Sequence, residues 1–137
     1  MTAGEIERYI YGRISAMPLP IGGGVYYRGT RPMQNTSAGA TEDLIIAVTT
    51  GNHELVQRGT AIINVYVPDV LTSSGMFMRD KGRTDSVEAW LATLPALLSS
   101  PSIQFYTNSL IVTLPEESIH QHFVSLKMDF ITINTNQ

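Results

Sequence analysis

The chain has 137 residues, carries a net charge of −3 and contains no cysteine. Its length predicts a single domain, 1–137, that buries a hydrophobic core of its own. The absence of cysteine excludes disulfides, thiolate nucleophiles and cysteine-ligated zinc, and the lack of a lysine and arginine cluster argues against specific nucleic-acid binding.

Apolar runs are short and charged residues are few. No run approaches the roughly 20 residues that a membrane span needs, and no basic segment precedes an apolar one at the N-terminus, so we expect a soluble, unsecreted protein with no membrane partner. Only 15% of the residues are charged, against roughly 25% in typical soluble domains. Such a surface favours a subunit that assembles with other subunits.

The first predicted helix begins at a capping box. Thr2 and Glu5 have the spacing at which each side chain accepts a hydrogen bond from the other residue's backbone amide. Apolar residues then recur every three or four positions, until Pro18 prevents the helix from continuing. The apolar stripe consists of Ile6, Ile10, Ile14 and Met17.

Three glycines, 22–24, precede a short predicted strand over 25–28. Phosphate-binding glycine loops follow a strand and open a helix, whereas these glycines follow a helix and precede a strand. We therefore interpret them as a flexible turn.

The most regular strands are predicted over 43–50 and 60–67, the second ending at Pro68. Both faces of 43–50 are largely apolar, which indicates a central place in the sheet. Gly51 and Asn52, followed by the short connection 53–59, predict that the two strands form an antiparallel hairpin. The apolar face of 60–67 carries Ala61, Ile63, Val65 and Val67.

Residues 69–84 have no periodic pattern and are predicted to form a long mobile loop. Its centre carries three consecutive apolar residues, Met76, Phe77 and Met78. Two interpretations remain open: Phe77 packs back on the domain, or the three side chains form a docking surface for another subunit.

A second helix is predicted over 85–98, opened by a capping pattern at Asp85 and kinked near Pro95. Strands follow over 103–107, 109–114 and 120–133. Together these elements predict an α+β fold, with two helices packed on one face of a mainly antiparallel sheet. The inward residues of this second helix and of the last strand are predicted to be Val87, Trp90, Leu91, Leu94 and Leu98, and Val124, Leu126, Met128 and Phe130.

The best candidate metal ligands are His120 and His122, which follow Glu116 and Glu117 closely. A mononuclear site needs three or four converging ligands, and a strand entrance is also an ordinary place for solvated polar residues. The sequence thus leaves one alternative function open, a small-ligand or metal-binding α+β module that uses His120, His122 and Glu117.

No serine lies in a nucleophile turn, and no catalytic His and Asp pair is visible. Arg28 and Arg31 flank a glycine at a strand end, where they either bind a carboxylate or form an ion pair on the surface or between subunits. We expect neither an enzyme nor a bound cofactor.

Four segments in their order along the chain resemble one group of viral proteins. These segments are Gly24–Gly29, Ile62–Val67, Asp85–Leu98 and His122–Phe130. The pattern is similar to that of the tail terminator and tail-completion (head-to-tail joining, or neck) proteins of long-tailed bacteriophages and prophages.

The resemblance implies a structural protein without catalytic residues, which forms a ring, expected to be hexameric, at the head-proximal end of the tail. Its partners would be other copies of itself, the tail-tube protein on one side and the head connector or neck proteins on the other. Its place would be the virion tail or neck, and the bacterial host cytoplasm during assembly. The predicted contact residues are Met76, Phe77, Met78, Arg79, Arg28 and Arg31.

Overall fold

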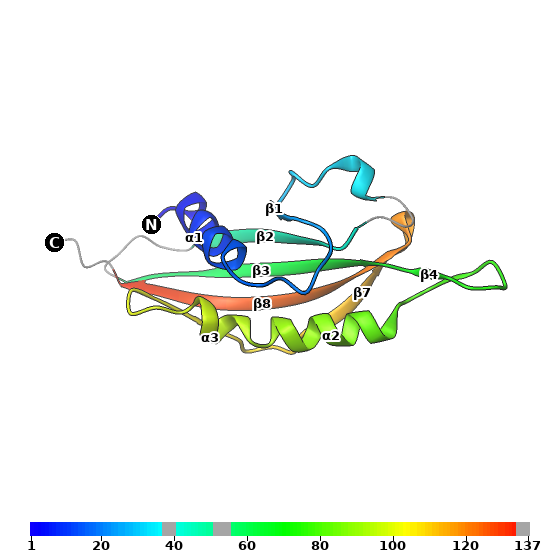
Figure 1. Ribbon diagram of the computed structural model, residues 1–137. Helices are drawn as coiled ribbons and strands as arrows, with labels where there is room; N and C mark the ends of the chain where they lie inside the picture. Colours follow the sequence, from blue (N-terminus) through cyan, green and yellow to red (C-terminus); the bar gives the residue numbers. More distant parts are fainter. Residues whose placement is uncertain (37–40, 51–55, 134–137) are drawn as a thin grey trace.

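The computed structural model describes residues 1–36, 41–50 and 56–133. Within them, six strands form one sheet in the order β1-β2-β3-β8-β6, and β7 also pairs with β8 (Figure 1). β1 runs parallel to β2, and the other pairs in this sheet are antiparallel. The strands are β1 (Val25–Tyr27), β2 (Asp43–Thr50), β3 (Val56–Pro68), β6 (Ile103–Tyr106), β7 (Val112–Glu116) and β8 (Gln121–Ile133).

The predicted antiparallel hairpin is confirmed, because β2 pairs with β3 from Asp43 opposite Tyr66 to Thr50 opposite Gly59. β3 begins earlier than predicted and pairs with β8 along its whole length. The predicted turn at Gly51 and Asn52, with the connection that follows as far as residue 55, lies outside the described residues, as does the tail 134–137.

Helix α1 (Ala3–Ser15) has the predicted capping box. The backbone amide of Thr2 donates to Glu5 Oε1, and that of Glu5 donates to Thr2 Oγ1, each at 3.1 Å. Three residues of the predicted stripe, Ile6, Ile10 and Ile14, are fully buried. Met17 lies beyond the end of α1 and is only partly buried against the core.

The second helix differs from its prediction at both ends. α2 (Lys81–Leu91) begins four residues before Asp85, because Asp80 is the N-cap and accepts a hydrogen bond from the amide of Arg83 at 3.2 Å. The predicted kink at Pro95 is wrong. α2 ends at Leu91 and a separate helix, α3 (Leu94–Leu98), carries Pro95 in its first turn, where a missing amide donor costs nothing.

Residues 69–84 do not form the structureless loop that was predicted. β4 (Val70–Leu71) pairs with β5 (Phe77–Met78), and a turn with Gly75 at φ +83° joins them. The amide of Thr72 donates to the carbonyl of Met76 at 2.8 Å and closes the turn. This hairpin extends beyond one end of the sheet (Figure 1). We call residues 69–79 the arm.

The two faces of the sheet differ in burial. Residues from alternate positions of β2, β3 and β8 form one hydrophobic cluster with buried residues of α1, α2 and α3. The strand members of this cluster include Leu44, Ile46, Ala61, Ile63, Val65, Val124, Leu126, Met128 and Phe130. Trp90, predicted to be inward, is only partly buried against the cluster. The combination of helices with a mostly antiparallel sheet agrees with the predicted α+β class.

The opposite alternate positions are mostly half-exposed and form what we call the open face. Register places Ile45 beside Asn64 and Ser125, and Ala47 beside Ile62 and Lys127. Two short 3₁₀ turns, η1 (Met33–Thr36) and η2 (Glu117–Ile119), follow β1 and β7. None of the described helices is long and apolar enough to cross a membrane.

Candidate functional site

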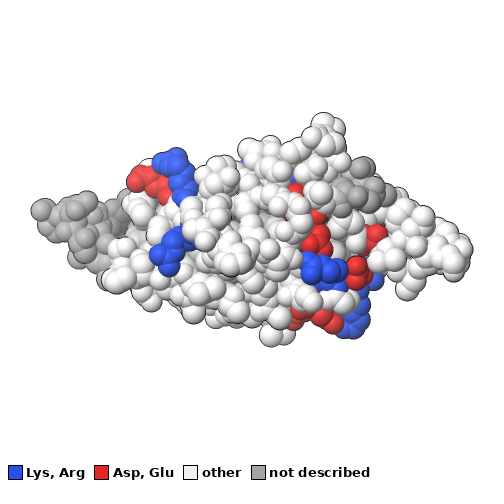
Figure 2. Space-filling model, viewed as in Figure 1, with Lys and Arg blue, Asp and Glu red and all other residues white. Residues whose placement is uncertain are grey.

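The arm exposes four large apolar side chains, on a hairpin whose strands β4 and β5 form only two residue pairs. The exposed fractions are 48% for Val70, 59% for Leu71, 64% for Met76 and 57% for Met78. Residues 70–78 contain no charged side chain, and the arm is correspondingly white in Figure 2. An isolated two-stranded hairpin is only marginally stable in water. The arm therefore presents an uncharged, largely exposed apolar surface.

Phe77 is the exception among the three apolar residues at the centre of the predicted loop. Its ring stacks on His120 with the centroids 4.0 Å apart, while Met76 and Met78 remain exposed. The interpretation that Phe77 packs back on the domain is confirmed, and the docking surface stays a prediction that now concerns the two exposed methionines.

The histidines are arranged differently from the prediction. His120 does not lie on the last strand, since it caps η2 with φ +53° and β8 begins after it. His122 Nδ1 lies 2.6 Å from Asp69 Oδ1, at the base of the arm. Within residues 1–36, 41–50 and 56–133, no three His, Asp or Glu side chains gather closely enough to hold a metal ion. The histidines instead fix the arm to the end of the sheet.

A groove of about 710 Å³ lies on the open face. Ile45, Ala47 and Ile62 give it an apolar floor, and Arg28 and Glu116 are among its walls. The other residues that line it include Asn64, Tyr66, Gly29, Arg31, Thr36 and Ile119. The sequence analysis did not identify this groove. Its only sequence signal was the second apolar face of 43–50.

Arg31 and Asp43 hold the segment after β1 against one side of this groove. Asp43 is fully buried, and its Oδ2 accepts from Arg31 Nε at 2.8 Å. Arg31 Nη2 also donates to the carbonyl of Asn35 and to Gln121 Oε1, both at 2.9 Å. Only 9% of the Arg31 side chain is exposed. Its charge is thus paired inside the subunit.

Tyr66, on β3, contacts both Arg31 of this network and a neighbouring aromatic residue of β8. The Arg31 guanidinium lies 4.4 Å from the centre of its ring, and the Phe123 ring lies 5.2 Å away on β8. Burial raises the pKa of the Tyr66 hydroxyl above its ordinary value, and the charge of Glu116 raises it further. Tyr66 therefore stays neutral at physiological pH.

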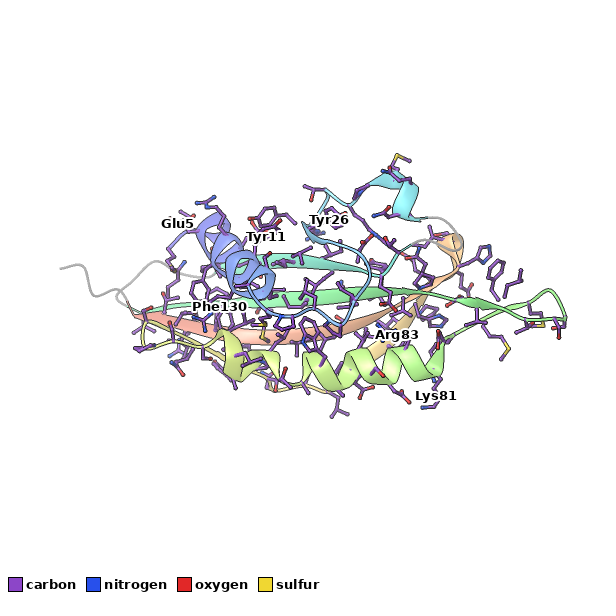
Figure 3. The ribbon with its side chains drawn as sticks, in the orientation of Figure 1. Glu5, Tyr11, Tyr26, Lys81, Arg83 and Phe130 are labelled. Carbon is purple, nitrogen blue, oxygen red and sulfur yellow. The ribbon has the colours of Figure 1, made fainter. Side chains whose placement is uncertain are left out.

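The other predicted contact residues, Arg28 and Arg79, are exposed. Neither forms an ion pair with any residue that the structure describes. Arg83, in contrast, forms two bonds to the carboxylate of Glu42, at 2.7 and 2.6 Å. Figure 3 shows Arg83 pointing from α2 toward the sheet, while Lys81 lies at the outer end of the helix. The arrangement thus leaves one free guanidinium at the arm and one at the groove.

No family model and no curated protein matches the chain. Among solved structures, one similar chain is 18% identical over 98% of this chain and 94% of its own length, with a TM-score of 0.47. A likeness of this strength carries no argument about fold or function.

Proposed function

We propose that this chain is a structural subunit of a phage or prophage tail, a tail terminator or head-to-tail joining protein that forms a ring by contacts between copies. The observation that carries the proposal is the arm, with four large apolar side chains exposed on an uncharged hairpin. Exposed apolar surface that is gathered in one place marks a contact site with another protein.

The proposal puts the helices on one face of the sheet and leaves the open face to neighbouring subunits and partners. The cluster shared by α1, α2, α3 and the buried strand positions supports this arrangement. The two other surfaces of the ring would contact the tail-tube protein and the head connector or neck proteins. Protein contacts alone perform this function, and no catalytic group takes part.

The first experiment measures self-assembly. Light scattering across a concentration series, with electron microscopy of the same samples, should detect closed rings that form from subunits of 15.1 kDa. The resemblance noted in the sequence leads us to expect six subunits in a ring. Wild-type protein that stays at the subunit mass at every concentration would contradict the proposal.

A double variant, Met76→Ser with Met78→Ser, tests the role of the arm. Because a fully buried methionine contributes about 1.5–3 kcal/mol and these side chains are more than half exposed, we expect a loss of about 1–2 kcal/mol per side chain. The concentration needed for assembly should therefore rise roughly 5- to 30-fold for each methionine removed.

The matched control is Leu110→Ser, because Leu110 is 87% exposed and lies outside both the arm and the groove. This variant should assemble like the wild-type protein. Equal assembly of the arm variant and the wild-type protein would show that the arm is not a subunit contact.

A further inference from the structure

The chain carries both an exposed apolar projection and an apolar groove, in different places. We propose that the arm of one subunit lies in the open-face groove of the next copy. This inference rests on the proposed function and specifies the contact that builds the ring. It pairs the exposed side chains of Met76 and Met78 with the floor formed by Ile45, Ala47 and Ile62.

The shapes and polarities of the two surfaces match. The arm is a narrow hairpin without charges between residues 70 and 78, and the floor of the groove consists largely of half-buried aliphatic side chains. If the arm packed on this floor, apolar surface of both the arm and the groove would be removed from water. The contact would also stabilise the β4–β5 hairpin, which is too short to be stable alone.

Opposite charges are present at the margins of the two surfaces. Arg79 stands at the base of the arm and Glu116 stands in the wall of the groove, both exposed. Neither takes part in an ion pair among the described side chains. The walls of the groove carry the exposed Arg28 as well as Glu116. When the apolar tip lies on the floor, an ion pair between Arg79 of one copy and Glu116 of the next favours a second copy of this chain as the occupant.

The two surfaces cannot meet within one subunit or by a symmetric contact of one patch with itself. The arm continues past the end of β3 and points away from the sheet (Figure 1), whereas the groove lies on the sheet's open face. A contact between two different patches is either exchanged reciprocally within a two-fold dimer or repeated from copy to copy as a heterologous contact, which closes as a ring when the rotation allows. The inference is the second arrangement, and cross-linked products that stop at the dimer would overturn it.

Single cysteines test this contact directly, since the chain has none of its own. One preparation carries Met76→Cys in the arm and the other carries Ala47→Cys in the groove. The two are mixed in equal amounts under assembly conditions and treated with a short bismaleimide. We expect covalent dimers in the mixture at several times the yield of either preparation alone.

The control replaces Ala47→Cys with Leu97→Cys, because Leu97 is 48% exposed on α3. That mixture should give only the background yield. A chain that carries both Met76→Cys and Ala47→Cys should give a ladder of products that stops at the number of subunits in the ring.

The outcomes separate the inference from the function it rests on. Rings without arm-to-groove dimers overturn the inference, leave the groove to another protein and leave the proposed function intact. Dimers from Met76→Cys alone mean a symmetric contact between two arms and also overturn it. The absence of both rings and covalent dimers contradicts the inference and the proposed function together.

Discussion

Asp43 is the residue whose surroundings explain the shape of the groove. It is fully buried on the open face and accepts from Arg31 Nε, the Gly24 amide, Asn35 Nδ2 and Thr41 Oγ1 at 2.8 to 3.3 Å. These donors come from segments on both sides of β1. One carboxylate thus joins the segment 24–36 to the edge of the sheet, and this segment forms one wall of the groove.

Removal of this carboxylate should destabilise the protein strongly. Asp43→Ala leaves the guanidinium of Arg31 buried without its partner, and breaking a buried pair from one side costs about 3–5 kcal/mol. The free energy of unfolding, measured by urea denaturation at pH 7, should fall by that amount.

The control is Asp85→Ala, which removes the exposed pair of Lys81 with Asp85 at 2.6 Å. An exposed pair at this helical spacing contributes only about 0.3–0.5 kcal/mol. Similar losses in the two variants would mean that the Asp43 network does not hold the segment.

The sequence could not reveal this network. Arg31 is 12 residues from Asp43 and 90 from Gln121, and no local pattern relates positions that far apart. The contact of His122 with Asp69 could not be predicted for the same reason, because the two residues are 53 positions apart. The pattern placed His120 and His122 on one strand, but the left-handed backbone at His120 ends η2 there and takes this residue out of the strand.

At the level of elements, helices and strands were predicted correctly where packing against the core makes apolar residues recur at regular spacing. The alternation in 60–67 and 120–133 follows from one face packing against a core, and β3 and β8 match it closely. The start of α2 was missed because Lys81, Gly82 and Arg83 show no apolar period. The arm was missed because each of its strands has only two residues, which is too short to show alternation.

The capping box of α1 gives a pH-dependent contribution to stability. The hydrogen bond from the backbone of Thr2, and then the bond with its side chain, lower the pKa of Glu5 below its ordinary value of 4.5. A carboxyl whose pKa is lower in the folded state stabilises the fold above its ordinary pKa. This stabilisation is lost as the pH falls through the lowered value.

Glu5→Gln should therefore be less stable than the wild-type protein at pH 7, and the difference should shrink as the pH falls below about 4.5. Thermal unfolding midpoints of both proteins, measured from pH 7 to pH 3, check this expectation. A difference that stays constant over the whole range would mean that the ionised carboxylate of Glu5 contributes nothing to the cap.

Across the whole molecule, the extent of strand pairing predicts which regions resist local unfolding and which open easily. β3 and β8 pair over 13 residues each at the centre of the sheet, and their inward residues belong to the core. The arm has two ladder pairs and mostly exposed side chains. Local opening should therefore be easy in the arm and should require global unfolding in the middle of β3 and β8.

Hydrogen exchange on dilute subunits and on assembled rings should show this contrast. In dilute subunits, amides of residues 70–78 should exchange within the earliest time points, while amides in the middle of β3 and β8 remain protected longest. In rings, arm amides should slow by at least about 10-fold, because each 1.4 kcal/mol of contact energy slows local opening tenfold. Amides of α3, which the proposed contact leaves uncovered, serve as the internal control. Strong and equal protection of the arm in both samples would show that the arm is already stable in the isolated subunit. Such a result would contradict ordering of the arm by assembly.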